Sequence, residues 1–166
     1  MSDPLGEDEP LRSWVGTAGR IRTAIEGLSD GDLDLRGGAD GWSIRETVHH
    51  LVEANLIASN ILIAAISQSG CVYDWSWVNP DKGWMERLGY RTAPVGPALA
   101  TLRSLCEHMA ELIKAVPGAF DREVQLLDSP GAEPHRTTVR ALVSEQIEHV
   151  EGHLGTVREI RAAHGR

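Results

Sequence analysis

Apolar residues recur at every third or fourth position in four long segments of the chain, which is the spacing of one buried helical face. These segments cover residues 10–28, 43–69, 95–116 and 138–163. The second begins with a capping box, in which Ser43 and Glu46 can satisfy each other's backbone N–H groups, and it stops before Gly70. Thr137 or Thr138 can cap the start of the fourth. The pattern therefore predicts four helices.

The segment over residues 43–69 differs from the others because apolar residues cover most of its circumference from Leu51 onward. A helix of this kind is buried on more than one side. It is therefore either the central helix of the fold or a helix that also faces a partner subunit.

The stretch between the second and third helices, residues 71–97, holds three of the five tryptophans and three prolines. Within it Asp81 can cap a short helix that Gly89 stops. The tryptophans either close one end of the core or form a pocket wall. Residues 120–127 fit an extended piece or a helical extension equally well, and residues 128–136 have the composition of a loop.

No segment shows a convincing strand alternation, so we expect an all-α four-helix bundle. The connection between the second and third helices exceeds 25 residues. It is long enough to cross the bundle. A chain of 166 residues suits one domain, which we place at residues 10–166 behind a disordered acidic tail at residues 1–9.

Charge and cysteine content limit the classes of partner that we expect and the cellular compartment of the protein. The net charge is -8 and no basic stripe is present, which argues against a nucleic-acid partner. Cys71 and Cys106 form no disulfide framework, and the N-terminus resembles no secretory signal, so we expect a cytoplasmic protein. The most apolar run, residues 56–66, is about half of a membrane span, so we expect no membrane partner.

Candidate chemistry centres on His149 and His153, which lie four residues apart and therefore share one helical face. With about 100° per residue, both histidines fall at the edge of the apolar face and turn inward. Glu151 projects to the opposite side, and the order H-V-E-G-H differs from the H-E-x-x-H motif of zinc proteases. The pair therefore supplies two ligands of a metal site that needs a third.

His50 is the third candidate, because the same projection places it on the core-facing stripe of the second helix. His49 is rotated by about 100° from it and is expected to be structural. Three histidines from two facing helices can hold a metal with an open position for water or substrate. Glu46 and Glu145 could accept hydrogen bonds from ligating imidazoles.

Other polar residues have smaller expected roles. Gln146 could line the site, and His135 lies in a loop where it could border a pocket. His108 and His164 are expected at the surface. Neither cysteine stands in a pattern that would activate a nucleophile.

Two stretches carry a family resemblance: G-W-S-I-R-E-T-V-H-H-L-V-E-A at residues 41–54, and H-V-E-G-H-L-G-T-V-R-E-I-R about 100 residues later. They resemble the DinB/YfiT family of metalloenzymes. The resemblance implies a four-helix bundle, often homodimeric, that binds nickel or zinc, with iron or manganese as alternatives. The ligand positions of the family match His50, His149 and His153.

The resemblance also implies a range of activities on small-molecule substrates. From it we expect transfer of a low-molecular-weight thiol to an electrophile by a metal-dependent S-transferase. The alternatives are a metal-dependent hydrolase and a stress-related binding protein in which the metal only stabilises the bundle. No residue is identified as the general base, because a bound metal can itself lower the pKa of the nucleophile.

Overall fold

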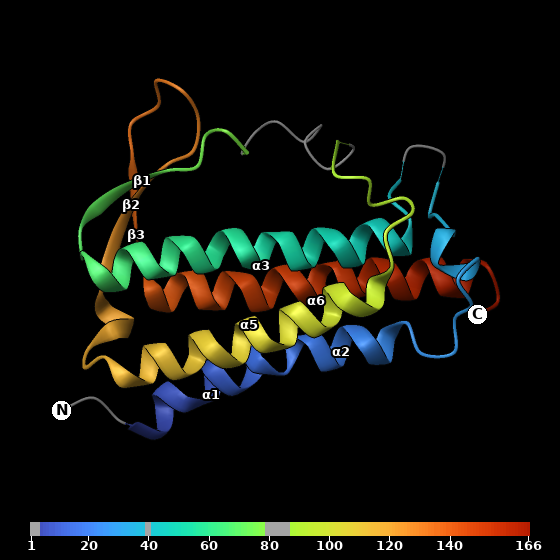
Figure 1. Ribbon diagram of the computed structural model, residues 1–166, viewed down its shortest axis with the longest axis horizontal. Helices are drawn as coiled ribbons and strands as arrows, with labels where there is room; N and C mark the ends of the chain where they lie inside the picture. Colours follow the sequence, from blue (N-terminus) through green and yellow to red (C-terminus); the bar gives the residue numbers. More distant parts are fainter. Residues whose placement is uncertain (1–3, 39–40, 79–86) are drawn as a thin grey trace.

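The computed structural model describes residues 4–38, 41–78 and 87–166, and its main feature is a four-helix bundle (Figure 1). The first member of the bundle is formed by α1 (Pro4–Val15) and α2 (Thr17–Ala24). The other three are α3 (Ile44–Ser67), α5 (Val95–Ala115) and α6 (Val139–Ala163). Two short 3-10 segments, η1 (Asp32–Asp34) and η2 (Ala119–Asp121), lie in the connections. The predicted four-helix bundle is confirmed.

The first bundle member begins earlier than predicted and is bent. The backbone is helical from Pro4, within the stretch of residues 1–9 that was expected to be a disordered tail, and Pro10 lies inside the helix. A proline is well tolerated at a first helical position, which Pro4 takes. The Thr17 hydroxyl donates to the Trp14 carbonyl at 2.6 Å where α1 gives way to α2, and such local bonds compete with the helical ladder.

The predicted capping box at the start of α3 is confirmed. The Ser43 backbone N–H donates to Glu46 Oε2 at 2.8 Å, and the Glu46 N–H donates to Ser43 Oγ at 3.1 Å. By length and composition α3 could cross a membrane, but half of its most apolar stretch is buried, as in the core helix of a bundle. It packs against both α5 and α6.

A small three-stranded sheet, which the sequence did not predict, covers one end of the bundle (Figure 1). Strand β1 (Cys71–Asp74) pairs in parallel with β2 (Glu123–Leu127), and β2 pairs antiparallel with β3 (His135–Thr138). The strands have only four or five residues, too few for a clear alternation. The short helix predicted from Asp81 falls largely outside the described residues.

Strand β1 belongs to the long connection between α3 and α5, and its pairing places the sheet beside the bundle. Arg45, only 3% exposed, holds another part of this connection. Its guanidinium donates to Asp34, to Asp30 and, at 3.3 Å, to the Ala93 carbonyl. The segment that leads into α5 is thereby fixed against the first turns of α3.

His49 belongs to this same junction and is buried, as predicted. One ring nitrogen lies 3.1 Å from the Ala93 carbonyl, and the imidazole stacks on Tyr90 with ring centroids 5.1 Å apart. A second buried polar contact joins α1 to α3, where the Trp14 indole donates to Asn55 Oδ1 at 2.8 Å. Both contacts are structural, and they fix the face of α3 that carries His50.

Candidate metal centre

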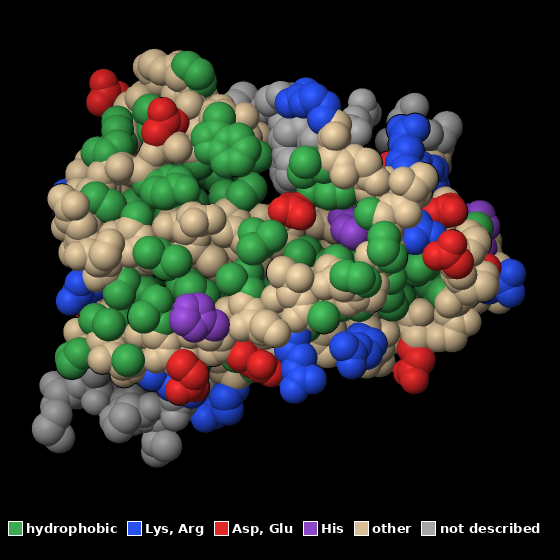
Figure 2. All heavy atoms as spheres, in the orientation of Figure 1, with side chains coloured by type: hydrophobic (Ala, Val, Ile, Leu, Met, Phe, Trp, Pro, Cys, Tyr) green, Lys and Arg blue, Asp and Glu red, His purple; other side chains and the backbone are tan. Residues whose placement is uncertain are grey.

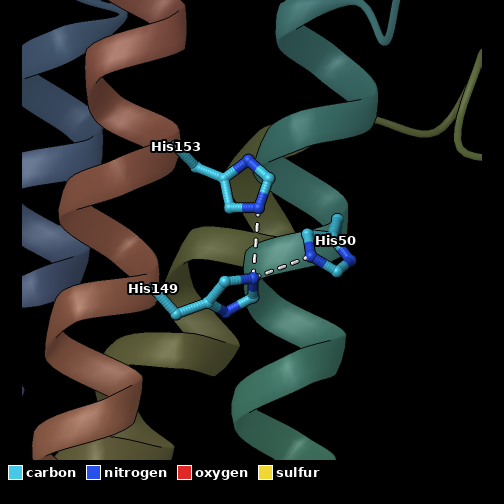
Figure 3. A group of neighbouring side chains, drawn as sticks. All are labelled: His50, His149 and His153. Atoms are coloured by element: carbon cyan, nitrogen blue, oxygen red, sulfur yellow. Dashed lines mark hydrogen bonds between the residues drawn. The ribbon is translucent and has the colours of Figure 1, made fainter. Parts of the chain in front are cut away.

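Three imidazoles, one from α3 and two from α6, converge on one point between these helices (Figure 3). His50 Nε2 lies 3.0 Å from His149 Nε2, and His153 Nε2 lies 3.1 Å from the same atom. One ring nitrogen from each histidine can be chosen so that all three lie within 4.8 Å of one another. The structure therefore brings together the three residues that the helical projections selected.

The arrangement fits a metal better than a hydrogen-bonded cluster. His149 Nε2 faces two other ring nitrogens, but a neutral ring nitrogen has either one N–H or one in-plane lone pair. One proton on this atom cannot serve both neighbours. Nitrogens bound about 2.0–2.1 Å from one ion lie roughly 3 to 3.4 Å apart, which matches the observed separations. The site therefore has the donor set and spacing of a three-histidine metal centre.

Burial keeps these imidazoles in the form that a metal needs. It lowers the pKa of His50 to about 3, with further contributions from His149 and His153. It lowers the pKa of His153 to about 4, and it also lowers that of His149. All three rings are therefore neutral at pH 7, with lone pairs available for coordination.

Trp42 packs against two of the three rings. Its indole stacks on His153 with centroids 5.7 Å apart and an interplanar angle of 11°, and it lies 4.7 Å from the His50 ring at 57°. These contacts restrict the rotation of both imidazoles. Trp42 therefore helps to hold the rings in their converging orientation.

The three histidines lie toward one end of a cavity of about 670 Å³. Apolar residues of α3 form one wall: Ala54, Ile57, Ala58 and Ile61. The opposite wall comes from α6 and includes Leu142, Glu145 and Gln146. From His50 to Ile61 the wall is roughly 16 Å long at 1.5 Å per residue, and residues of the sheet and its edge line the far end. Such a volume accommodates a small organic molecule.

Comparison with known proteins agrees with this fold and site. The model of the DinB superfamily matches residues 14–157, which is most of the chain. The chain belongs to the DinB superfamily. It is 25% identical over 162 residues to GK0616 of Geobacillus kaustophilus, covering 93% of this chain and 86% of that one. It is 24% identical over 131 residues to YfiT of Bacillus subtilis, covering 70% of each.

Both relatives carry the name "putative metal-dependent hydrolase". The solved structure of YfiT, described as a four-helix bundle of unusual topology, superposes with a TM-score of 0.82 at 20% identity. The superposition covers 99% of this chain and 91% of YfiT. The bundle with its added sheet is thus the fold of this DinB chain.

The carboxylates near the centre of this DinB protein are mostly engaged elsewhere. Glu46 is held by the capping box and by ion pairs with Arg36 at 2.8 Å and Arg91 at 3.2 Å. Glu151 is exposed and pairs with Arg20 at 2.6 Å, as expected for the solvent side of α6. Glu145 lines the cavity one turn before His149. No hydrogen bond joins these acids to the three imidazoles in the described part of the chain.

Gln146 lines the cavity as predicted, and its buried Oε1 has no hydrogen-bond partner among the described residues. The predicted surface positions of His108 and His164 are confirmed. Cys106 is fully buried, and burial raises the pKa of its thiol to about 11, so it is a poor nucleophile. Cys71 is a free cysteine that does not line the cavity.

From sequence, His135 is a loop residue that could border a pocket, and the structure places it at the far end of the cavity beside Asp128 and Trp75. His135 Nδ1 lies 2.7 Å from Asp128 Oδ2, and the Trp75 indole donates to Asp128 Oδ1 at 2.6 Å. The three residues border three different strands. The strand pairing brings these three residues together, and no local sequence signal indicated that they would meet.

Proposed function

We propose that this DinB protein is a metal-dependent enzyme that transfers a low-molecular-weight thiol to an electrophilic substrate. The observation that carries the proposal is the convergence of His50, His149 and His153 beside a cavity of about 670 Å³. These residues would hold a divalent ion, with nickel or zinc preferred and iron or manganese as alternatives. When bound, such an ion lowers the pKa of a coordinated thiol or water toward neutrality.

A thiol suits this site because it needs no separate base. Glu46 and Glu151 are paired with arginines, and Glu145 makes no hydrogen bond to the three imidazoles in the described part of the chain. A thiol has an ordinary pKa of about 8.5, far closer to neutrality than that of water, so a thiol held by the ion would give up its proton to solvent without a protein base. The sulfur would form a bond to the electrophilic carbon as the bond from that carbon to the leaving group breaks, and the leaving group would depart with that electron pair.

The thiol has to come from a co-substrate. Cys106 is buried away from the cavity, and Cys71 does not line it. The chain's own contribution is to bind and enclose the two reactants. The apolar wall formed by Ala54, Ile57 and Ile61 excludes water from the reacting atoms.

Hydrolysis is the second candidate, and the names of the related proteins favour it. In that reaction water would occupy the place of the thiol. Its oxygen would bond to the acyl carbon while the leaving group departed with a proton. The same three histidines would hold the ion, so the two candidates differ in the nucleophile and not in the site.

The test compares metal-loaded protein with protein stripped by chelator. Cysteamine or cysteine is combined with 1-chloro-2,4-dinitrobenzene, and p-nitrophenyl acetate without thiol measures hydrolysis. We expect thiol conjugation that disappears on stripping and returns with nickel or zinc. Ester cleavage without thiol conjugation would support the hydrolase. Stoichiometric metal with neither activity would support a stress-related binding protein that the metal only stabilises.

The proposal includes a homodimer in the cytoplasm. Ile63, Val72 and Trp77 are 45%, 58% and 65% exposed. Figure 2 shows hydrophobic side chains gathered on one face toward the end that carries the sheet. Such a surface favours association with a second copy. Sedimentation at micromolar concentration should therefore detect a dimer, whereas a monomer at every concentration would exclude it.

A further inference from the structure

The end of the cavity remote from the metal centre carries a hydrogen-bonded cluster of Trp75, Asp128 and His135. The sheet topology explains why these residues meet. Trp75 follows β1 directly and Asp128 follows β2, and these strands are parallel, so both residues leave the same edge. His135 begins β3, which is antiparallel to β2 and therefore starts at that edge.

The cluster fixes the hydrogen-bonding role of His135. Asp128 uses one oxygen for the Trp75 indole N–H and the other for His135 Nδ1. A carboxylate accepts hydrogen bonds, so Nδ1 carries the proton that it donates to Asp128. In the neutral imidazole, Nε2 is then an acceptor. His135 therefore offers a lone pair to a ligand, and Asp128 adds negative charge behind it.

Two other polar side chains near this end present acceptor oxygens. Glu145 projects from α6 into the cavity and interacts electrostatically with both His135 and Asp128. Gln146 Oε1, one residue further along, is buried and lacks a hydrogen-bond partner among the described residues. No Lys or Arg is among the described residues that line the cavity. A carboxylate or phosphate on a ligand would therefore meet no lysine or arginine among the described lining residues.

We propose that this end of the cavity binds a hydrogen-bond-donating or cationic group of the substrate, with His135 as the specificity-determining residue. The inference rests on the proposed function, because the reacting end of the same molecule would lie at the three histidines. The α3 wall of the cavity between His50 and Ile61 is roughly 16 Å long. The substrate class is therefore an elongated molecule with a reactive head, an apolar middle and an amine, amide or hydroxyl tail.

The test uses three matched thiols with cobalt-loaded protein: 6-amino-1-hexanethiol, 1-hexanethiol and 6-mercaptohexanoic acid. Binding is followed by the cobalt–thiolate absorption band. We expect the amine to bind roughly tenfold or more tightly than the carboxylate, the size of one hydrogen bond to a charged group. Equal affinities, or tightest binding of the carboxylate, would overturn the proposal.

Asp128→Asn should change which thiol is preferred, which is a more specific outcome than a loss of binding. The amide oxygen is needed by the Trp75 N–H, so the amide NH2 faces His135 Nδ1. Nδ1 must then accept, which turns Nε2 into a donor. In Asp128→Asn the preference for the amine thiol should therefore shift toward the carboxylate thiol. In His135→Gln the preference for the amine thiol should be reduced. Asp121→Asn, on the exposed η2 segment, is the matched control and should leave the order unchanged.

A metal-free arm separates this inference from the proposed function. Hexylamine and sodium hexanoate are titrated calorimetrically into chelator-treated protein. Preference for hexylamine that His135→Gln reduces would support the inference even where no thiol binds cobalt. Hexanoate binding as tightly as hexylamine, including absence of binding by both, would refute it while leaving the metal site intact.

Discussion

Replacement of Trp42 should weaken metal binding although Trp42 is not a ligand. Its indole contacts the rings of His50 and His153 with centroids 4.7 and 5.7 Å away. Aromatic contacts of this kind contribute about 0.5–1.5 kcal/mol each, so Trp42→Ala removes about 1–3 kcal/mol in total. Because these contacts order the ligand rings before the ion binds, the loss corresponds to roughly 5- to 150-fold weaker affinity.

The assay is calorimetric titration of zinc into metal-free protein, with a competing chelator to bring the affinity into range. Trp42→Phe keeps an aromatic ring and should give an intermediate value. Trp77→Ala is the matched control, because Trp77 is 65% exposed and does not line the cavity. Wild-type zinc affinity in Trp42→Ala would refute the view that this indole orders the ligand rings.

Two further predictions concern stability. The pKa values of His50 and His153 lie below the ordinary value, at about 3 and 4, so the unfolded chain binds more protons between these values and about 6.5. Urea unfolding of metal-free protein should therefore show full stability above pH 6.5 and a decline as the pH falls; a profile identical to that of a variant with all three histidines changed to Gln would contradict this. Ser43→Ala removes one side of the capping box and should cost about 1 kcal/mol, or roughly 2–4 °C in Tm, whereas Ser104→Ala on the exposed face of α5 should change little. An unchanged Tm in Ser43→Ala would show that the cap is dispensable.

The helices and the inward orientation of the three histidines were predictable from sequence because their signals are local. The apolar period marks each helix, and the capping box fixes the start of α3 at Ser43. His149 and His153 share a face through their spacing alone, and the orientation of His50 follows from the apolar stripe around it. The family resemblance then joined residues 99 positions apart, which the Nε2 separation of 3.0 Å supports.

The sheet and the polar end of the cavity depend on pairing between distant segments. Strand β3 is entirely polar, with the sequence H-R-T-T, and it adjoins a stretch with loop composition. Asp128 and His135 belong to that stretch, and although His135 could be expected to border a pocket, nothing local indicated that the two residues meet. Their role became apparent only when β1, β2 and β3 were seen to share one edge.

The most direct test of the central claim is the metal content of purified His149→Ala. His149 Nε2 contacts both of the other ligand nitrogens, so its removal leaves a two-histidine site. Elemental analysis after dialysis should find about one divalent ion per wild-type chain and per His108→Ala chain, and almost none in His149→Ala. Full stoichiometric metal in His149→Ala would contradict the assignment of the site.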